Sequence, residues 1–470
     1  WVRFNYRKAY DNYKWRSPYI RGLYDKGYET SFTDGKGRYS YGEKEIWYVA
    51  TVETKTHIAE FIVSPRQDCK QVNNELDGRR GTGSYYKLDR IDIYTKSERY
   101  KNGTYNASAK PVQSCHFTYN YSLCKKTPDN NGTDGKLTLE KVHFTYRNNL
   151  SGAARPYEFE YNTQVNGTDV EYARDAVDRW GNYQPGGAAN IDYPYNDPLT
   201  SKAEMDQRAA LWNLKAINLP SGGRYEVDYE SDSYAYVQNE VAMHMFKIAS
   251  LEPYRDINDQ LIAPTTAIQH GKDAADQHRK VFFQLEKPIP SNLSAAERKK
   301  LMLRYIREGE YLYFKVKINL TKNNNTKEYV GGYAKVLDVN VDDKSIVNSN
   351  YIWGYVTLDY MRVNGESTQF HPFTEAGARH IRYNQSSVLY EDAPNADMEQ
   401  LSKSQIKNIG ATLLANGKDF IDIFRDFTAM LYDDGNDRLS DIDLGKSYLR
   451  MRTPDKIKYG GGHRVKEIRV

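Results

Sequence analysis

The sequence predicts a mainly β protein in which repeated antiparallel hairpins form an extended or shell-like sheet, with an inserted β subdomain and a two-helix segment. The first observation is the stretch 211–230, where an apolar run, a Pro-Ser-Gly-Gly turn and a segment alternating Tyr or Val with Glu or Asp follow one another. A period of two on either side of a turn is typical of a β-hairpin. Gly222 and Gly223 lie in the turn, where we expect backbone angles that other residues resist.

Both halves of this hairpin recur upstream. Residues 88–93 and 139–144 share the register of 214–219, namely Leu, two residues, Ile or Val, one residue and a large apolar residue. Residues 117–121 and 157–161 resemble the second half, and each follows a copy of the first. The repeat therefore predicts three related hairpins.

Composition gives the third observation. Of 470 residues, 13% are aromatic, and Tyr (41) far exceeds Phe (15), although the mean hydropathy is −0.81. Tyrosine packs its ring on strand neighbours while its hydroxyl reaches water, so the excess indicates many exposed strands and thin cores. The length indicates two to four domains.

The charge and the hydropathy of the chain restrict which kinds of partner are expected. The net charge is +4, and basic residues are interleaved with acidic ones rather than gathered into a stripe, which disfavours nucleic acid. No apolar run approaches the roughly 20 residues that span a bilayer, so no membrane span is expected. Because the chain starts at Trp1 without a methionine and stops at Val470 within a strand-like pattern, we expect a piece of a longer protein.

The hairpin framework is expected to occupy residues 1–231. Residues 1–41 have little periodicity and are predicted to form loops and short strands, whereas 45–63 predict a long hairpin. Its inward candidates are Trp47, Val49, Ile58, Phe61 and Val63. Residues 201–211 predict a short helix, with Ser201 as N-cap and Glu204 three residues later.

Beyond the framework we expect an inserted β subdomain at 232–392, of barrel or sandwich type. Its predicted strands are 239–252, 281–285, 311–320, 329–341 and 351–362, with a helix at 295–306. Two amphipathic helices are expected within a helical segment at 393–445. Residues 446–470 are predicted to return to the framework as a hairpin whose turn is the triple glycine 460–462.

The three cysteines are Cys69, Cys115 and Cys124. Cys115 and Cys124 end one predicted strand, and nine steps of about 3.3 Å place them roughly 30 Å apart, beyond disulfide reach. Pairing of Cys69 with either of the others stays open beside the alternative of free, buried thiols.

The motif DRWGNY at 178–183 places an acid, a base, a tryptophan and a glycine together. We favour a structural role, in which Asp178 accepts hydrogen bonds from turn amides, Gly181 adopts a positive φ and Trp180 packs onto the sheet. Trp180 and Trp212 are expected to be largely buried.

No catalytic or cofactor site is predicted. Glu226, Asp228 and Glu230 alternate on the outward face of a strand, without the pocket that would separate their pKa values. His116 and His143 occupy equivalent places in a repeated HFTY, which indicates a shared packing role.

Calcium is the one metal that the sequence allows. The acidic cluster at 433–437 could hold it, although a solvated loop explains the same residues: Asp433, Asp434, Asn436 and Asp437. A second loop, 129–140, follows part of a calcium-loop pattern but carries Asp134 where glycine is expected.

The runs LKAINLPSGGRYEVDYE, DRWGNY, IWYVATVETKTHIAEF and GKLTLEKVHFTY resemble segments of very large surface and secreted proteins of Bacteroidota that are related to Rhs/YD-repeat proteins. The resemblance implies a β-rich extracellular chain exported across the outer membrane, through the type IX route, with its hairpins forming a scaffold or shell. It also implies partners: the remainder of the same long chain, outer-membrane secretion machinery or surface glycans. The uneven spacing of the hairpins departs from the strict YD repeat.

Three functions follow as hypotheses. The first is a non-catalytic structural segment of a giant secreted or cell-surface protein, acting as scaffold, adhesin stalk or encapsulating shell. The alternative is a glycan-binding module, which a shallow groove lined by two or more exposed aromatic side chains would favour. A carbohydrate-active enzyme is the second alternative and needs two carboxylates in a cleft.

Overall fold

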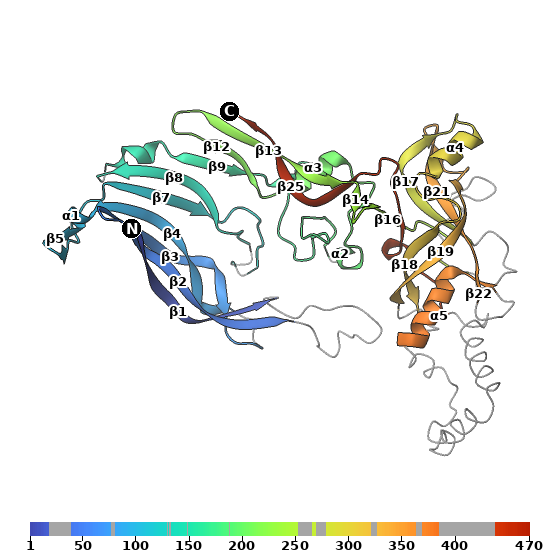
Figure 1. The fold of residues 1–470 in the computed structure, drawn as a ribbon, viewed down its shortest axis with the longest axis horizontal. Helices are drawn as coiled ribbons and strands as arrows, with labels where there is room; N and C mark the ends of the chain where they lie inside the picture. Colours follow the sequence, from blue (N-terminus) through green and yellow to red (C-terminus); the bar gives the residue numbers. More distant parts are fainter. Residues whose placement is uncertain are drawn as a thin grey trace, which may run out of the picture.

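The structure is a computed structural model that describes residues 1–17, 39–76, 80–128, 130, 133–147, 149–187, 189–251, 266–268, 279–320, 327–362, 369–384 and 438–470. It contains two β units, a curved antiparallel sheet and a smaller barrel (Figure 1). The predicted mainly β class is thereby confirmed. None of the described helices is long and apolar enough to cross a membrane.

The larger unit is a ten-stranded sheet in which nine strands follow chain order and every neighbouring pair is antiparallel. The strands, in sheet order, are β1 (Arg3–Ser17), β2 (Ser40–Glu53), β3 (His57–Val72), β4 (Arg80–Thr95), β7 (Gln113–Asn120), β8 (Thr138–Tyr146), β9 (Tyr157–Tyr161), β12 (Leu214–Asn218), β13 (Arg224–Tyr234) and β25 (Lys458–Arg469). The three repeated hairpins correspond to the pairs β4 with β7, β8 with β9 and β12 with β13. Their prediction from the repeated register is confirmed.

Tyrosine stabilises this sheet from its face. Tyr48 stacks on Tyr86 with ring centroids 5.5 Å apart, and the Tyr119 and Tyr161 hydroxyls donate to strand carbonyls at 2.9 and 2.8 Å. Few sheet side chains are fully buried, whereas the main apolar cluster lies in the barrel. The thin core expected from the Tyr excess is therefore present in the larger unit.

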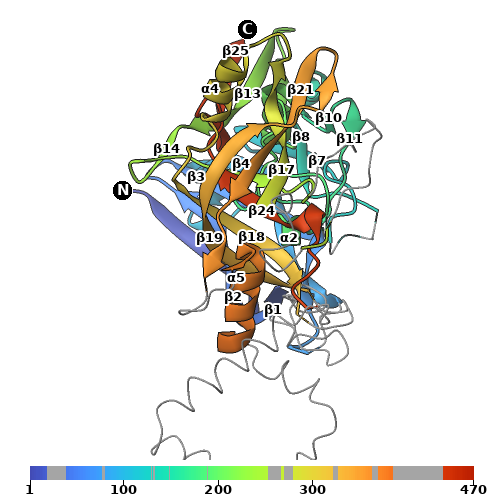
Figure 2. The same cartoon turned by 90° about the vertical axis from the view of Figure 1, so that its right-hand side faces the viewer.

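The smaller unit is a barrel built from a seven-stranded sheet, in which six strands follow one another and the two-residue β20 (Ile346–Val347) pairs with β21. The chain passes into it after β13 and returns from it to β25. In order the six strands are β16 (His244–Lys247), β24 (Tyr448–Met451), β18 (Tyr311–Asn319), β19 (Lys327–Val341), β21 (Asn350–Leu358) and β17 (Lys280–Pro290). Residues just after β16 close it, because the Phe282 N–H donates to the Ser250 carbonyl at 2.9 Å. Figure 2 looks onto this unit, where α4 (Ala295–Met302) and α5 (Pro372–Asn384) pack against β19.

Shorter elements connect these strands. They are α1 (Lys96–Arg99), β5 (Tyr100–Lys101), β6 (Thr104–Tyr105), η2 (Leu150–Ala154), β10 (Gln164–Val165), β11 (Thr168–Asp169), α2 (Ala189–Asp192), α3 (Lys202–Ala210), β14 (Tyr236–Val237), β15 (Glu240–Val241), β20 (Ile346–Val347), β22 (Met361–Arg362), β23 (Gln369–Phe370) and η5 (Leu444–Lys446). The predicted helix at 201–211 is confirmed as α3, because the Ser201 hydroxyl accepts a hydrogen bond from the Glu204 amide at 3.2 Å. Of the predicted helical segment 393–445, residues 393–437 lie outside the described residues.

The prediction of a return hairpin at 446–470 is wrong. Tyr448–Met451 is a barrel strand, and β25 is one continuous strand that pairs with β13. The triple glycine is a bulge within β25, where the register shifts between Ser231 and Ser233. Gly460 and Gly461 have φ of +124° and +89°, so the pattern that indicated a turn marks a bulge instead.

Residues 1–41 were expected to lack a long strand, which is also wrong, because β1 runs for 15 residues beside β2. Most of its side chains are exposed at the sheet edge, so no alternation of buried and exposed residues marks it in the sequence. In the next hairpin Ile58 is buried, as expected. Trp47 is 51% exposed, against expectation, because it lies on β2 opposite the exposed β1.

The central turn differs from its prediction in one residue. Gly222 has φ +90°, which confirms the need for glycine there. Gly223 has no positive φ, and a Cβ atom on it would meet Leu219 Cδ1 at an ordinary 3.5 Å. Only Gly222 therefore requires glycine for its backbone conformation.

Candidate functional site

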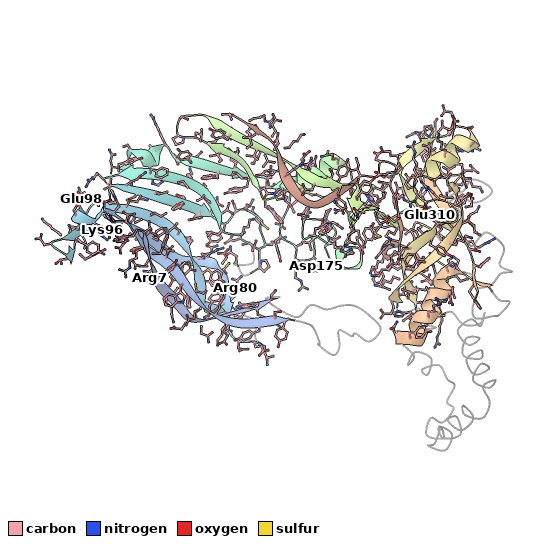
Figure 3. All side chains as sticks on the ribbon, viewed as in Figure 1. Arg7, Arg80, Lys96, Glu98, Asp175 and Glu310 are labelled. Atoms are coloured by element: carbon pink, nitrogen blue, oxygen red, sulfur yellow. The ribbon has the colours of Figure 1, made fainter. Side chains whose placement is uncertain are left out.

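A concave surface that includes an exposed tryptophan, Trp180, lies between the sheet and the barrel. We call this cavity of about 580 Å³ the junction groove. Residues that line it and carry the argument below are Asp178, Arg179, Trp180, Tyr195, Tyr234, Glu240, Arg450, Arg452 and Lys458. Figure 3 shows the side chains on the ribbon, with Glu310 labelled on the barrel.

The turn at 178–182 presents Trp180 to the groove. Asp178 Oδ1 accepts hydrogen bonds from the amides of Trp180 (2.8 Å) and Asn182 (2.9 Å), and Gly181 has φ +85°. The predicted roles of Asp178 and Gly181 are confirmed. The predicted burial of Trp180 is wrong, because its side chain is 60% exposed.

The contact of Trp180 with Gly461 in β25 explains why its side chain is exposed. A Cβ atom built on Gly461 would lie 4.0 Å from Trp180 Cε2, so the indole edge meets bare backbone of the β25 bulge. A glycine offers no side chain that could cover the ring. Trp212, the other tryptophan expected to be buried, is only partly buried and has φ +61°.

Two tyrosines continue the aromatic lining. Burial raises the pKa of the Tyr234 hydroxyl, and a hydrogen bond from Trp180 offsets part of that rise. Tyr195 packs edge-on against Tyr448, with ring centroids 5.3 Å apart. The groove is therefore lined by a fixed, exposed indole and two partly buried phenols.

Four cations face the same groove, against the two carboxylates of Asp178 and Glu240. The Arg452 guanidinium is neutralised by Glu310, to which it donates at 2.7 and 3.1 Å. Arg450 lies over the Tyr313 ring, 4.6 Å from its centroid.

Lys458 Nζ donates to the Met243 carbonyl at 3.2 Å. Its pKa is lowered, first by burial and then by the Arg179 guanidinium. Within the described residues no carboxylate forms an ion pair with Arg179 or Lys458. Arg179 and Lys458 thus line the groove without an ion-pair partner among the described residues, although Asp178 and Glu240 line it as well.

Asp178 forms no ion pair with either cation. One of its carboxylate oxygens accepts hydrogen bonds from the two turn amides, and the other accepts from Asn196 Nδ2 at 3.3 Å. Its hydrogen bonds therefore hold the loop that carries Trp180.

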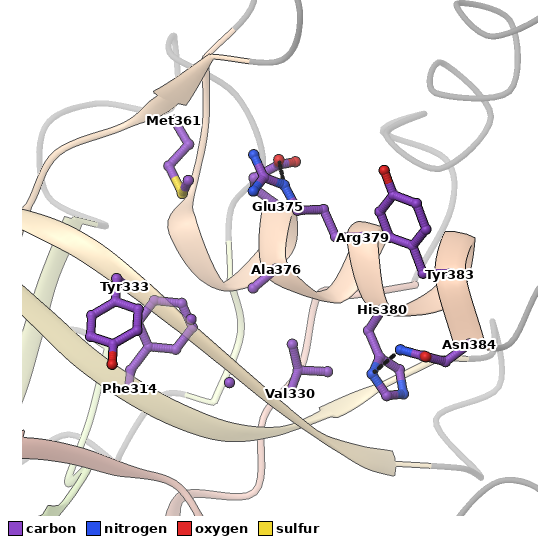
Figure 4. A pocket seen from close by; sticks show the side chains of 12 residues that line it. Phe314, Val330, Tyr333, Met361, Glu375, Ala376, Arg379, His380, Tyr383 and Asn384 are labelled. Atoms are coloured by element: carbon purple, nitrogen blue, oxygen red, sulfur yellow. Dashed lines mark hydrogen bonds and ion pairs between the residues drawn. The ribbon is translucent and has the colours of Figure 1, made fainter.

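A second cavity, of about 500 Å³, lies between α5 and the strands β18 and β19 (Figure 4). Arg379 Nε donates a hydrogen bond to Oε1 of the buried Glu375 at 2.5 Å. Burial lowers the pKa of His380, which lies on the same helix. Residues 385–437, which follow α5 in the chain, lie outside the described residues.

The acidic residues that the sequence places on one strand face are engaged in ion pairs. Glu230 pairs with Arg464 at 2.8 Å, and Asp228 pairs with Arg469 at 2.7 Å, which joins β13 to β25. Glu226 lies on the same strand, and none of the three lines either cavity described above.

The two histidines of the repeated HFTY are directly opposite in β7 and β8. Their rings stack with centroids 4.5 Å apart and an interplanar angle of 1°, which confirms the predicted shared packing role. His116 Nε2 also lies 2.9 Å from Thr145 Oγ1.

The next features are the predicted calcium sites and the three cysteines. In the described part of the chain no group of three or more His, Cys, Asp or Glu side chains is placed to hold a metal ion. The acidic cluster 433–437, which includes Asp433, Asp434, Asn436 and Asp437, lies outside that part, as do Asp129 and Asn131. Cys69, Cys115 and Cys124 form no disulfide, and burial raises the pKa of the latter two.

Sequence reasoning missed Arg179, Lys458 and the two tyrosines as parts of a common site. They come from segments that are far apart in the chain, and the only local signal was the DRWGNY turn. No family model matches the chain, and no curated protein matches its sequence.

Proposed function

We propose that this chain is a non-catalytic structural segment of a very large secreted or cell-surface protein, acting as a scaffold, adhesin stalk or part of an encapsulating β-shell. One observation carries the proposal: the ten-stranded sheet ends on both sides in a long, exposed edge strand. The sheet also curves along its width (Figure 1), as a section of a shell would.

The first edge is β1, which among the described strands pairs only with β2. Phe4 (56%) and Tyr6 (59%) are exposed on it, and Trp1 (66%) is exposed just before it. An edge strand presents unpaired backbone N–H and C=O groups, and soluble proteins normally shorten, charge or cover such edges. The edge β1 does carry charged residues, but it is 15 residues long and also exposes aromatic side chains, so it is suited to pairing with a further strand.

The second edge is β25, which among the described strands pairs only with β13. Val465 and Ile468 are 49% and 59% exposed on it. We propose that further strands of the same long chain pair with both edges, so that this segment continues a larger sheet outside the cell.

The test is an intact-mass measurement of the native protein, with peptide mapping over its full length and separation of secreted, surface and cytoplasmic fractions. A surface or secreted species of several hundred kilodaltons that contains these residues would support the proposal. A mature species near the 54.4 kDa of this chain, or one confined to the cytoplasm, would overturn it.

Glycan binding is a second candidate, which the junction groove favours. Trp180 is an exposed aromatic side chain that can stack on a sugar, and the partly buried Tyr195 and Tyr234 line the same groove, which therefore holds one exposed aromatic ring rather than the two or more expected. A scaffold segment and a glycan-binding groove are compatible in one molecule.

A further inference from the structure

The junction groove offers an exposed aromatic ring on a fixed backbone turn. Trp180 is 60% exposed, and the two hydrogen bonds to Asp178 Oδ1 fix the turn that carries it. Because the backbone needs no reordering when a ligand stacks on the ring, such a side chain is suited to binding. The apolar face of a pyranose ring matches an indole face in size and in chemistry.

The charge beside this ring has a definite sign. Arg179 follows Asp178 in the same turn, and its guanidinium is close enough to Lys458 to lower the pKa of that ammonium group. Arg179 and Lys458 form no ion pair within the described residues, and holding two like charges together is unfavourable. An anion bound between them would relieve this repulsion and form charge-assisted hydrogen bonds.

The space fits a small ligand or the end of a chain. A cavity of about 580 Å³ falls within the usual range for small-molecule sites. An extended acidic peptide would be served better by a sheet edge than by a groove with an isolated flat ring.

From this juxtaposition we propose that the junction groove binds a carboxylate-bearing sugar, with the sugar ring stacked on Trp180 and the carboxylate held by Arg179 and Lys458. The inference deepens the glycan-binding candidate and is independent of the scaffold proposal. The ligand class is an acidic glycan, such as one that contains uronic acids.

Binding is measured by isothermal titration calorimetry on the 470-residue chain. The probes are trigalacturonic acid, its neutral counterpart galactotriose and a short poly-glutamate peptide. We expect trigalacturonic acid to bind at least about tenfold more tightly than galactotriose, and its affinity to fall as salt is added.

Matched variants separate the ring from the charges. Trp180→Ala should weaken trigalacturonic acid binding by at least about tenfold, whereas Trp47→Ala, which removes a 51% exposed indole elsewhere, should leave it unchanged. Lys458→Met should lower the affinity for trigalacturonic acid by about tenfold, whereas Lys466→Met, at an exposed position, should leave that affinity unchanged. Arg179→Gln, at an exposed position, repeats the charge test without altering β25.

Each outcome decides the proposal. Equal binding of the two sugars, with loss in Trp180→Ala, would overturn the acid preference while keeping the glycan-binding candidate. No binding of either sugar would overturn both, and poly-glutamate binding as tight as that of trigalacturonic acid would overturn the assignment to a sugar. None of these results bears on the mass or location of the native protein, which test the scaffold proposal separately.

Discussion

At the scale of single residues, the most buried ion pair described in the sheet joins Arg99 to Glu60. Arg99 donates to both Glu60 carboxylate oxygens, at 2.7 and 2.6 Å, and its guanidinium lies 4.2 Å from the ring centroids of both Tyr94 and Tyr105. The two charged side chains are only 6% and 14% exposed. Removing one partner would leave the other buried without its counter-ion.

We therefore expect Glu60→Ala to lower the free energy of unfolding by about 3 to 5 kcal/mol, measured by urea denaturation. The matched control is Glu158→Ala, which removes a pair with Lys141 whose side chains are 40% and 43% exposed. The control should cost less than about 1 kcal/mol. Equal losses in the two variants would contradict the account of Arg99.

His244 gives a prediction about pH. Burial, and after it the charge of Lys458, lowers its pKa from 6.5 to about 4, while its Nε2 lies 3.2 Å from the Ile457 carbonyl oxygen. Because the folded-state pKa lies below the unfolded value, its contribution is complete above pH 6.5. Between pH 6.5 and 4 the unfolded state takes up the proton first, and roughly 3 kcal/mol of stability is lost.

Thermal unfolding of His244→Gln between pH 4 and 7.5 tests this, because the glutamine amide can still donate to Ile457. The variant should lose less stability on acidification than the parent protein does. The variant and the parent protein must be compared at each pH, because Glu286 adds a pH dependence of opposite sign to both. Burial raises the pKa of Glu286 to about 7. That carboxyl group loses its stabilising effect as pH rises from 4.5 to about 7, the opposite direction. Parallel pH profiles would contradict the assignment to His244.

At the scale of elements, the central turn separates two neighbouring glycines. Gly222 has φ +90°, whereas Gly223 has no positive φ and has room for a Cβ atom. Gly222→Ala should therefore destabilise the protein by about 1 to 2 kcal/mol, and Gly223→Ala should have a much smaller effect. Melting temperatures of the two variants measure this, and a larger shift for Gly223→Ala would contradict the turn geometry.

The sequence predicted the strands whose residues alternate between apolar or aromatic and charged types. The hairpins around 88–161 and 214–234 carry this pattern in a repeated register, although most of their side chains are only partly buried, and the Ser201 N-cap marked the start of α3. It could not predict β1, because an exposed edge strand has no buried face and thus no period. The triple glycine in β25 was predicted to be a turn but forms a bulge, because glycines with positive φ occur in turns and in bulges alike.

At the scale of the whole molecule, the candidate site could not be read from the sequence. The junction groove joins the loop between β11 and α2, near residue 180, to β13 and to the return segment near residue 458. Their proximity depends on β25 adding to the sheet beside β13, a pairing that no local pattern specifies. Local pattern identified Asp178 and Gly181 correctly, since their roles depend only on the turn that contains them.

The central claim, that further strands continue this sheet, concerns backbone groups at its edges. Hydrogen–deuterium exchange followed by mass spectrometry can compare β1 and β25 in the native protein and in the isolated 470-residue chain. Amides that gain a strand partner exchange more slowly. The strand β18, flanked by two barrel neighbours, serves as internal control. We predict slower exchange in β1 and β25 of the native protein with β18 unchanged, whereas equal exchange in both proteins would contradict the account.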